Sequence, residues 1–169
     1  MRSIAEEWNG SSWTEVADLS TAREAFAAGG TVPSGIVAGG GTSAPNLSAT
    51  EIWTGAGAPV GGWATGGNLN TGRSTSGTAG TGNSTGLIFG GLPPTTAKTE
   101  SYDGSSWTEV NDLNTARNAM TGAGTSTSAL AFGGTAPPPG QAITELWNGT
   151  NWTEVNDLNT GRSSLRGTG

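Results

Sequence analysis

The chain has 169 residues, of which 33% are hydrophobic, 12% are charged and 30 are glycine. Its net charge is −6 with no basic run, which argues against nucleic acid or an anionic membrane surface as a partner. Because it has no cysteine and no histidine, the sequence excludes disulfides, thiolate chemistry and an ordinary Ser-His-Asp triad.

One segment occurs four times and sets the period of the chain. Residues 100–117 read ESYDGSSWTEVNDLNTAR, and residues 6–23 and 145–162 are close copies. Residues 51–73 are a looser copy with a longer glycine-rich turn. The copies recur at intervals of about 45–50 residues, which is a period typical of propeller blades.

In chain order, each repeat predicts four short strands. A small-residue stretch after each arginine predicts a first strand, and an apolar segment that ends in a glycine pair predicts a second one. The first strands are expected within 24–30, 74–80 and 118–124, and the second strands over 35–38, 86–89 and 128–132. No segment shows helical periodicity.

A hairpin completes each repeat. Alternating polar and apolar residues predict third strands at 99–102 and 143–147. Asp-Gly or Asn-Gly follows directly, which is the strongest short signal for a hairpin turn. The return strands are expected over 12–16, 106–110 and 151–155.

The order of these features resembles the kelch motif. Gly90-Gly91, Tyr102 and Trp107 stand where that family has its glycine pair, its aromatic residue and its downstream tryptophan. The resemblance covers nearly the whole chain. It implies an all-β, kelch-like β-propeller, in which each repeat is a four-stranded blade with its first strand nearest the central channel. The near-identical units also resemble Gly/Thr-rich repeat proteins in marine bacteriophage sequences.

On this map the chain, residues 1–169, is a single repeat array. It is expected to hold a partial blade with the third and fourth strands, three full blades and the first strand of a further blade, over 5–17, 22–66, 72–111, 116–156 and 162–168. Joining the two ends would still lack a second strand. Since open sheet edges and unpaired repeat faces are unfavourable, we expect a fragment of a longer repeat protein or a ring completed by other copies.

Each repeat has one glutamate and one arginine at fixed positions. They are Glu6, Glu51, Glu100 and Glu145, with Arg23, Arg73, Arg117 and Arg162. A catalytic group is expected once per ring, whereas these residues occur once per repeat. We therefore expect structural ion pairs between strands or blades.

The repeated tryptophans are expected to pack between blades. Trp13, Trp107 and Trp152 occupy the same position of the repeat. Trp63, in the irregular copy, is a weak candidate for stacking against a sugar ligand, because aromatic rings offer flat apolar faces.

The aspartates at Asp18, Asp112 and Asp157 are interpreted as turn residues. Calcium needs six to eight oxygen ligands in a defined loop, and one aspartate per turn does not supply them. The sequence therefore indicates no metal site, no catalytic residue and no cofactor.

We expect a non-enzymatic structural or binding protein, a phage virion component such as a tail fibre, decoration or host-recognition protein. Its partners would be further copies of the repeat, phage structural proteins or host surface glycans. The contact surface is assigned to polar loops over 31–34, 42–49, 54–62, 92–98 and 135–142.

Two alternatives remain. A propeller enzyme with a channel site is disfavoured by the absence of Cys and His and by the single tyrosine. An engineered repeat fragment is the other alternative. No signal peptide and no membrane segment is expected. The location would be the virion for a phage protein, and otherwise the cytoplasm or an unknown location.

Overall fold

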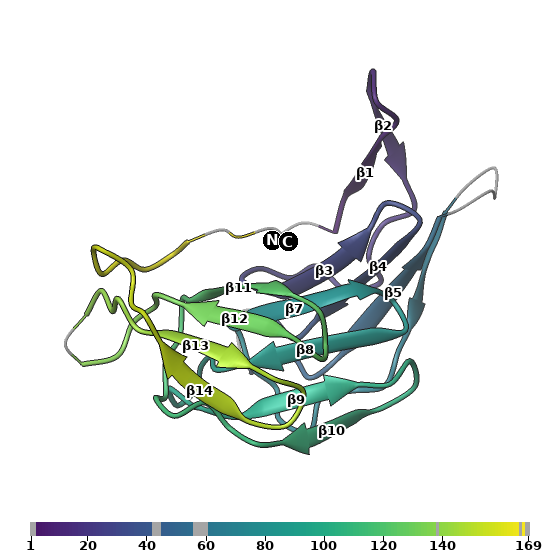
Figure 1. Ribbon diagram of the computed structural model, residues 1–169. Helices are drawn as coiled ribbons and strands as arrows, with labels where there is room; N and C mark the ends of the chain where they lie inside the picture. Colours follow the sequence, from purple (N-terminus) through teal and green to yellow (C-terminus); the bar gives the residue numbers. More distant parts are fainter. Residues whose placement is uncertain (1–2, 42–44, 56–60, 138, 166, 168–169) are drawn as a thin grey trace.

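The computed structural model describes residues 3–41, 45–55, 61–137, 139–165 and 167. The described residues form β-strands and no helix, which confirms the expected all-β class. Among them there is accordingly no helix that is long and apolar enough to cross a membrane. The strands build one two-stranded hairpin and three four-stranded antiparallel sheets (Figure 1).

Within each sheet, strands that follow one another in the chain are hydrogen-bonded neighbours. The hairpin consists of β1 (Ala5–Trp8) and β2 (Trp13–Val16). Sheet I contains β3 (Ala27–Thr31), β4 (Ser34–Ala38), β5 (Thr50–Thr54) and β6 (Gly62–Thr65). Sheet II contains β7 (Gly77–Gly82), β8 (Thr85–Phe89), β9 (Thr99–Tyr102) and β10 (Trp107–Val110). Sheet III contains β11 (Thr121–Gly124), β12 (Ala129–Phe132), β13 (Thr144–Trp147) and β14 (Trp152–Val155).

The strand expected over 162–168 is not found. Residues 162–165 and 167 are outside any strand, and 166 and 168 lie outside the described residues. In the three sheets a first strand is held by pairing with the second, as β11 is with β12. Among the described residues, no second strand pairs with 162–165 and 167 in this way.

The hairpin turns have the chemistry that the Asx-Gly dipeptides predicted. Gly104 has a φ of +99°, a left-handed conformation that glycine adopts at little cost. The Asp103 carboxylate accepts hydrogen bonds from the backbone N–H groups of Ser105 and Ser106, at 2.9 and 2.8 Å. The turn places Tyr102 opposite Trp107, with ring centroids 4.9 Å apart. Each hairpin therefore carries a preformed pair of aromatic rings.

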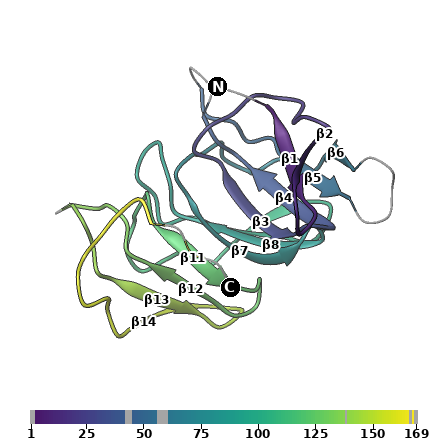
Figure 2. The same ribbon diagram turned by 90° about the horizontal axis from the view of Figure 1, so that it is seen from above.

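The first strands of the three sheets, β3, β7 and β11, lie side by side, and the other strands follow outward (Figure 2). The apolar core lies between consecutive sheets and forms two clusters. One joins sheet I to sheet II through Ala27, Ile36, Ala38, Leu69, Ile88, Tyr102 and Trp107. The other joins sheet II to sheet III through Ala79, Leu87, Phe89, Leu113, Met120, Ala129, Ala131, Trp147 and Trp152. We call each of these contacts a junction.

The glycine pair after each second strand lies in close contact with the backbone of the next repeat. Gly90 has a φ of +63°, and its neighbour Gly91 donates its N–H to the Arg117 carbonyl at 2.9 Å. A Cβ atom on Gly90 would collide with that carbonyl. The pair thus allows a close approach between repeats that a larger residue would block.

Candidate functional site

The buried arginines tie together separate parts of a sheet. Arg117 donates from Nη1 to the carbonyls of Gly133 and Ile143, at 2.8 and 2.7 Å. Its Nη2 donates to Glu145 Oε1 at 2.9 Å, and both side chains are fully buried. Arg117 therefore fastens the end of β12, the entry to β13 and β13 itself.

The same arrangement recurs in the two preceding sheets. Arg23 pairs with Glu51 at 2.6 Å, and Arg73 pairs with Glu100. Their Nη1 atoms donate to backbone carbonyls at the corresponding places, including Ala49 O for Arg23. The inter-strand ion pairs expected from the repetition are thus present in these three sheets.

The carboxylate of each pair is also held by the chain that enters the sheet. Glu145 Oε2 accepts hydrogen bonds from the backbone N–H and the side-chain amide of Asn114, at 2.7 and 2.9 Å. Burial lowers the pKa of the Arg117 guanidinium, and the negative charge of Glu145 acts in the opposite direction. The buried arginine and glutamate side chains of these three sheets are therefore engaged in structure.

The outermost members of the set differ from this expectation. Arg162 is exposed, and its Nε donates only to the carbonyl of Thr160, at 3.4 Å. Glu6 is exposed on β1. Among the described residues neither has an ion-pair partner.

The tryptophans also differ between the three sheets and the β1–β2 hairpin. Trp107 and Trp152 are buried at the junctions, and their indole N–H groups donate to the hydroxyls of Thr50 and Thr99. Trp13 belongs to the same repeat position but is exposed. Its expected packing between sheets is not found, because no sheet among the described residues covers this aromatic pair.

Trp63 packs against its cross-strand neighbour Trp53, with ring centroids 5.4 Å apart. Its indole N–H is buried and lacks an acceptor within the part of the chain that the structure describes. The position that Thr50 and Thr99 occupy in their sheets is taken on β1 by Ala5, which has no hydroxyl. A residue singled out as a ligand candidate is therefore placed in the packing of the first sheet.

The repeated aspartates link each turn to a distant strand. Asp112 Oδ1 accepts from the backbone N–H of Thr99 at 3.1 Å, and Asp157 Oδ1 accepts from that of Thr144 at 3.2 Å. Asp18 holds the N–H of Ala5 in the same way, at 3.3 Å. No group of three or more acidic side chains that could hold a metal ion is present in the described ranges.

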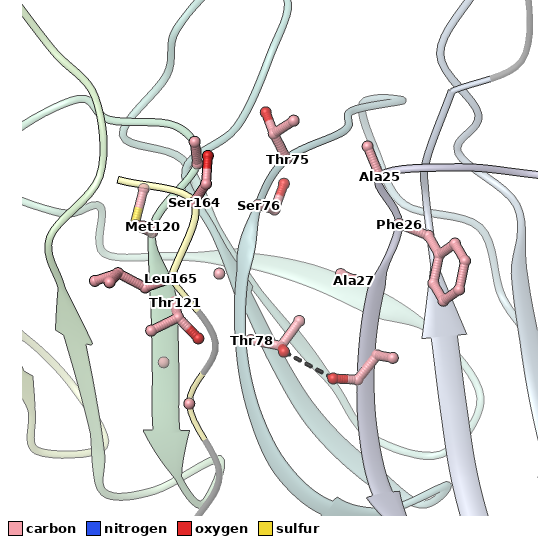
Figure 3. A pocket seen from close by; sticks show the side chains of 15 residues that line it. Ala25, Phe26, Ala27, Thr75, Ser76, Thr78, Met120, Thr121, Ser164 and Leu165 are labelled. Atoms are coloured by element: carbon pink, nitrogen blue, oxygen red, sulfur yellow. Dashed lines mark hydrogen bonds between the residues drawn. The ribbon is translucent and has the colours of Figure 1, made fainter. Parts of the chain in front are cut away.

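The remaining candidate is a groove along the first strands, which we call the axial groove (Figure 3). It contains a cavity of about 460 Å³ and continues into a second cavity of about 380 Å³. The lining side chains labelled in Figure 3 are small, hydroxylated or apolar: Ala25, Phe26, Ala27, Thr75, Ser76, Thr78, Met120, Thr121, Ser164 and Leu165. None of the residues that line either cavity is charged.

A line of backbone hydrogen bonds crosses one end of the axial groove. Thr75 N donates to Ala25 O, Ala119 N to Thr75 O, and Ser164 N to Ala119 O, each at 2.8 Å. All four residues have φ between 50° and 55°, and each stands two places after an arginine. The left-handed conformation costs a non-glycine residue roughly 1–2 kcal/mol, so the inter-sheet bonds must offset it.

The only sequence signal for the axial groove is the stretch of small residues that follows each arginine. Nothing in the residues Ala25, Thr75, Ala119 and Ser164 themselves indicates a left-handed backbone. Comparison with protein-family models and with curated proteins finds no match to this chain. Its function is therefore argued from the axial groove, the loops and the junctions.

Proposed function

We propose that this chain is a non-enzymatic structural or binding module, an arc of a kelch-like β-propeller that presents its axial groove and polar loops to a partner. The arrangement that supports a propeller is the equivalence of the two junctions. At both, the first strands lie adjacent and the aromatic pair of one sheet covers the apolar face of the preceding sheet. Equivalent junctions relate each sheet to the next by the same rotation, as in the blades of a propeller.

The observation that carries the binding role is that the structural residues of each repeat are buried, whereas a different set of residues lines the axial groove. The buried Arg–Glu pairs and the junction tryptophans are occupied by structure. The axial groove is lined by hydroxyl groups, small side chains and the apolar side chains of Phe26, Met120 and Leu165. A neutral, hydroxyl-rich glycan is the ligand class that such a surface favours, because it offers both hydrogen-bonding groups and apolar ring faces.

The polar loops divide between the two ends of the sheets. In an antiparallel meander, loops 31–34 and 54–62 share one end, whereas 42–49, 92–98 and 135–142 share the other. At the second end the loops bind neighbouring repeats: Asn46 Nδ2 donates to Leu92 O at 2.8 Å, and Asn118 Nδ2 to Thr95 Oγ1 at 3.2 Å. The first end is tied to the next repeat as well, since Asn83 N donates to Ser34 Oγ at 2.9 Å. Residues 42–44, 56–60 and 138 of these loops lie outside the described residues.

The proposal includes a phage virion component, such as a tail fibre, decoration or host-recognition protein. This part rests on the resemblance of the near-identical repeats to phage repeat proteins. A rigid repeat scaffold that carries polar loops suits recognition of a cell-surface glycan.

A glycan array tests the binding role. We expect binding to neutral glycans and weaker binding of Thr121→Val, which replaces a groove hydroxyl by a methyl group. Thr153→Val, on the exposed outer strand β14, is the matched control and should bind as the unmodified protein does. Absence of binding to every glycan, or equal binding by both variants, would overturn the assignment of the axial groove.

A further inference from the structure

We propose that the chain associates head to tail with a second copy of itself. The β1–β2 hairpin of one copy would pack on the open face of sheet III of the other, as consecutive sheets pack within the chain. The proposal rests on the two internal junctions and does not depend on the proposed glycan ligand.

At each internal junction, the aromatic pair of one sheet covers an aliphatic face of the preceding sheet. Leu87 on β8 is 1% exposed, because the aromatic pair Trp147 and Trp152 of sheet III packs in the same cluster. In the preceding junction, Ile36 on β4 is covered in the same way by Tyr102 and Trp107. Each sheet thus offers an aliphatic face at its second strand and receives an aromatic pair.

Sheet III has this aliphatic face. Gly167 lies beside Phe132 at one end of it, and the part around Leu130 is exposed. Leu130 occupies on β12 the register position that Leu87 occupies on β8, since each pairs with an alanine of the first strand. Leu130 is 37% exposed, compared with 1% for Leu87. Leu146 and Val155, on β13 and β14 of this sheet, are also exposed.

The β1–β2 hairpin has the complementary aromatic pair. Trp8 and Trp13 are 43% and 64% exposed, whereas the equivalent Trp147 and Trp152 are 2% and 5% exposed. The exposed pair has its rings 5.5 Å apart at 45°, and the buried pair has them 5.3 Å apart at 43°. The hairpin therefore already holds the shape that fills an internal junction.

The polar contacts are complementary as well. Arg162 and Glu6 are the exposed members of a set whose other members form buried ion pairs. At the internal junction, Asn114 binds the glutamate from the chain that precedes the arginine, and Asn159 stands at the same place before Arg162. Thr144 is placed to accept from the Trp13 indole of a second copy, as Thr99 accepts from Trp152.

Within one copy, the β1–β2 hairpin does not pack on sheet III. The β1–β2 hairpin and sheet III lie at opposite ends of the row of sheets (Figure 2). The shared sheet would take residues 162–165 and 167 from one copy and β1 and β2 from the other. No strand of either copy would occupy the position of the second strand. The contact therefore has fewer hydrogen bonds than an internal junction, so we expect association that depends on protein concentration.

Sedimentation equilibrium on the whole chain tests this contact. The unmodified protein is expected to show a mass that rises above 16.8 kDa with concentration. Glu6→Arg and Arg162→Glu should each remain at 16.8 kDa, because each places like charges across the contact. An equimolar mixture of the two variants should regain the association, because opposite charges then meet at every contact between unlike copies.

Lys98→Glu and Glu109→Arg are matched controls, because they make the same charge changes at an exposed pair in sheet II. Both should associate as the unmodified protein does, and circular dichroism should show all variants folded. A protein that stays at 16.8 kDa at every concentration would overturn the proposal. So would variants that associate unchanged, a mixture that regains nothing, or controls that lose association. A monomer that still binds glycans would leave the proposed function standing.

Discussion

The indole N–H of Trp107 donates to the hydroxyl of Thr50 at 2.9 Å, across the junction between sheets I and II. Trp152 and Thr99 repeat this bond at the next junction, at 3.1 Å. Both bonds are buried, so each satisfies a polar group that the aromatic pair carries into the core. The indole of Trp63 has no such bond among the described residues.

Thr50→Val is expected to lower the free energy of unfolding by about 1–3 kcal/mol, because it leaves the Trp107 indole N–H buried without an acceptor. Urea unfolding followed by tryptophan fluorescence measures the change. Thr108→Val, an exposed position on β10, is the control and should change the stability little. A loss no larger than that of the control would show that the bond contributes nothing.

Ala5→Thr is expected to stabilise the protein, because it places a hydroxyl at the position that serves the indole in the other sheets. One buried hydrogen bond contributes about 0.5–1.5 kcal/mol to stability. The gain should vanish when Trp63→Phe is also present, because phenylalanine has no N–H to donate. A gain of the same size in both backgrounds would point to strand propensity instead.

Arg117→Met should cost about 3–5 kcal/mol, because it leaves the carboxylate of Glu145 buried without its positive partner. Arg162→Met makes the same change at an exposed arginine and should be almost neutral in the monomer. The double variant Arg117→Met with Glu145→Leu should lose less than the sum of the two single losses. Additive losses would contradict the pairing.

Asp103 provides a test by pH. Hydrogen bonds from the backbone N–H groups of Ser106 and Ser105 lower the pKa of the Asp103 carboxyl to about 2 from 3.8. A depressed pKa in the folded state means that the carboxylate stabilises the turn above pH 3.8, and that this contribution is lost as the pH falls towards about 2.

Asp103→Asn should keep the turn and remove its titration. Asn148 occupies the same position in the last hairpin and accepts the equivalent backbone bonds from Thr150 and Asn151. Thermal unfolding between pH 5 and pH 2 should therefore depend less steeply on pH in the variant, with little difference at pH 7. NMR titration of the Asp103 carboxyl checks the pKa directly, and a value near 3.8 would contradict the geometry.

Repetition in the sequence predicted those features that every repeat builds from its own residues. The strands, the Asx-Gly turns and the pairing of Arg117 with Glu145 belong to this group. Repetition did not predict features that depend on which neighbour is present. Glu6, Trp13 and Arg162 are exposed because no sheet in the described part of the chain covers them, and no local sequence pattern predicts this.

Two further features have no sequence signal because backbone geometry alone determines them. The left-handed conformations of Thr75 and Ala119 occur at residue types that rarely adopt them, and bonds between sheets hold them there. The sequence places Asp112 in a turn but does not indicate that its carboxylate accepts a hydrogen bond from Thr99 on a strand. Such contacts depend on how the repeat folds back on itself, which composition and spacing leave open.

Gly90→Ala is expected to destabilise the protein by more than about 1 kcal/mol, because alanine is strained in the left-handed conformation. Gly90 has a φ of +63°, and its new methyl group would also meet the Arg117 carbonyl that Gly91 binds. Gly62→Ala is the control, since no atom lies within 4 Å of a Cβ at that position. Denaturant unfolding of both variants separates the combined strain and collision at Gly90 from the general effect of replacing glycine by alanine. Because the collision is with the next repeat, hydrogen exchange should rise first at the junction between sheets II and III. Equal stability of the two variants would mean that the repeats do not approach each other through the glycine pair.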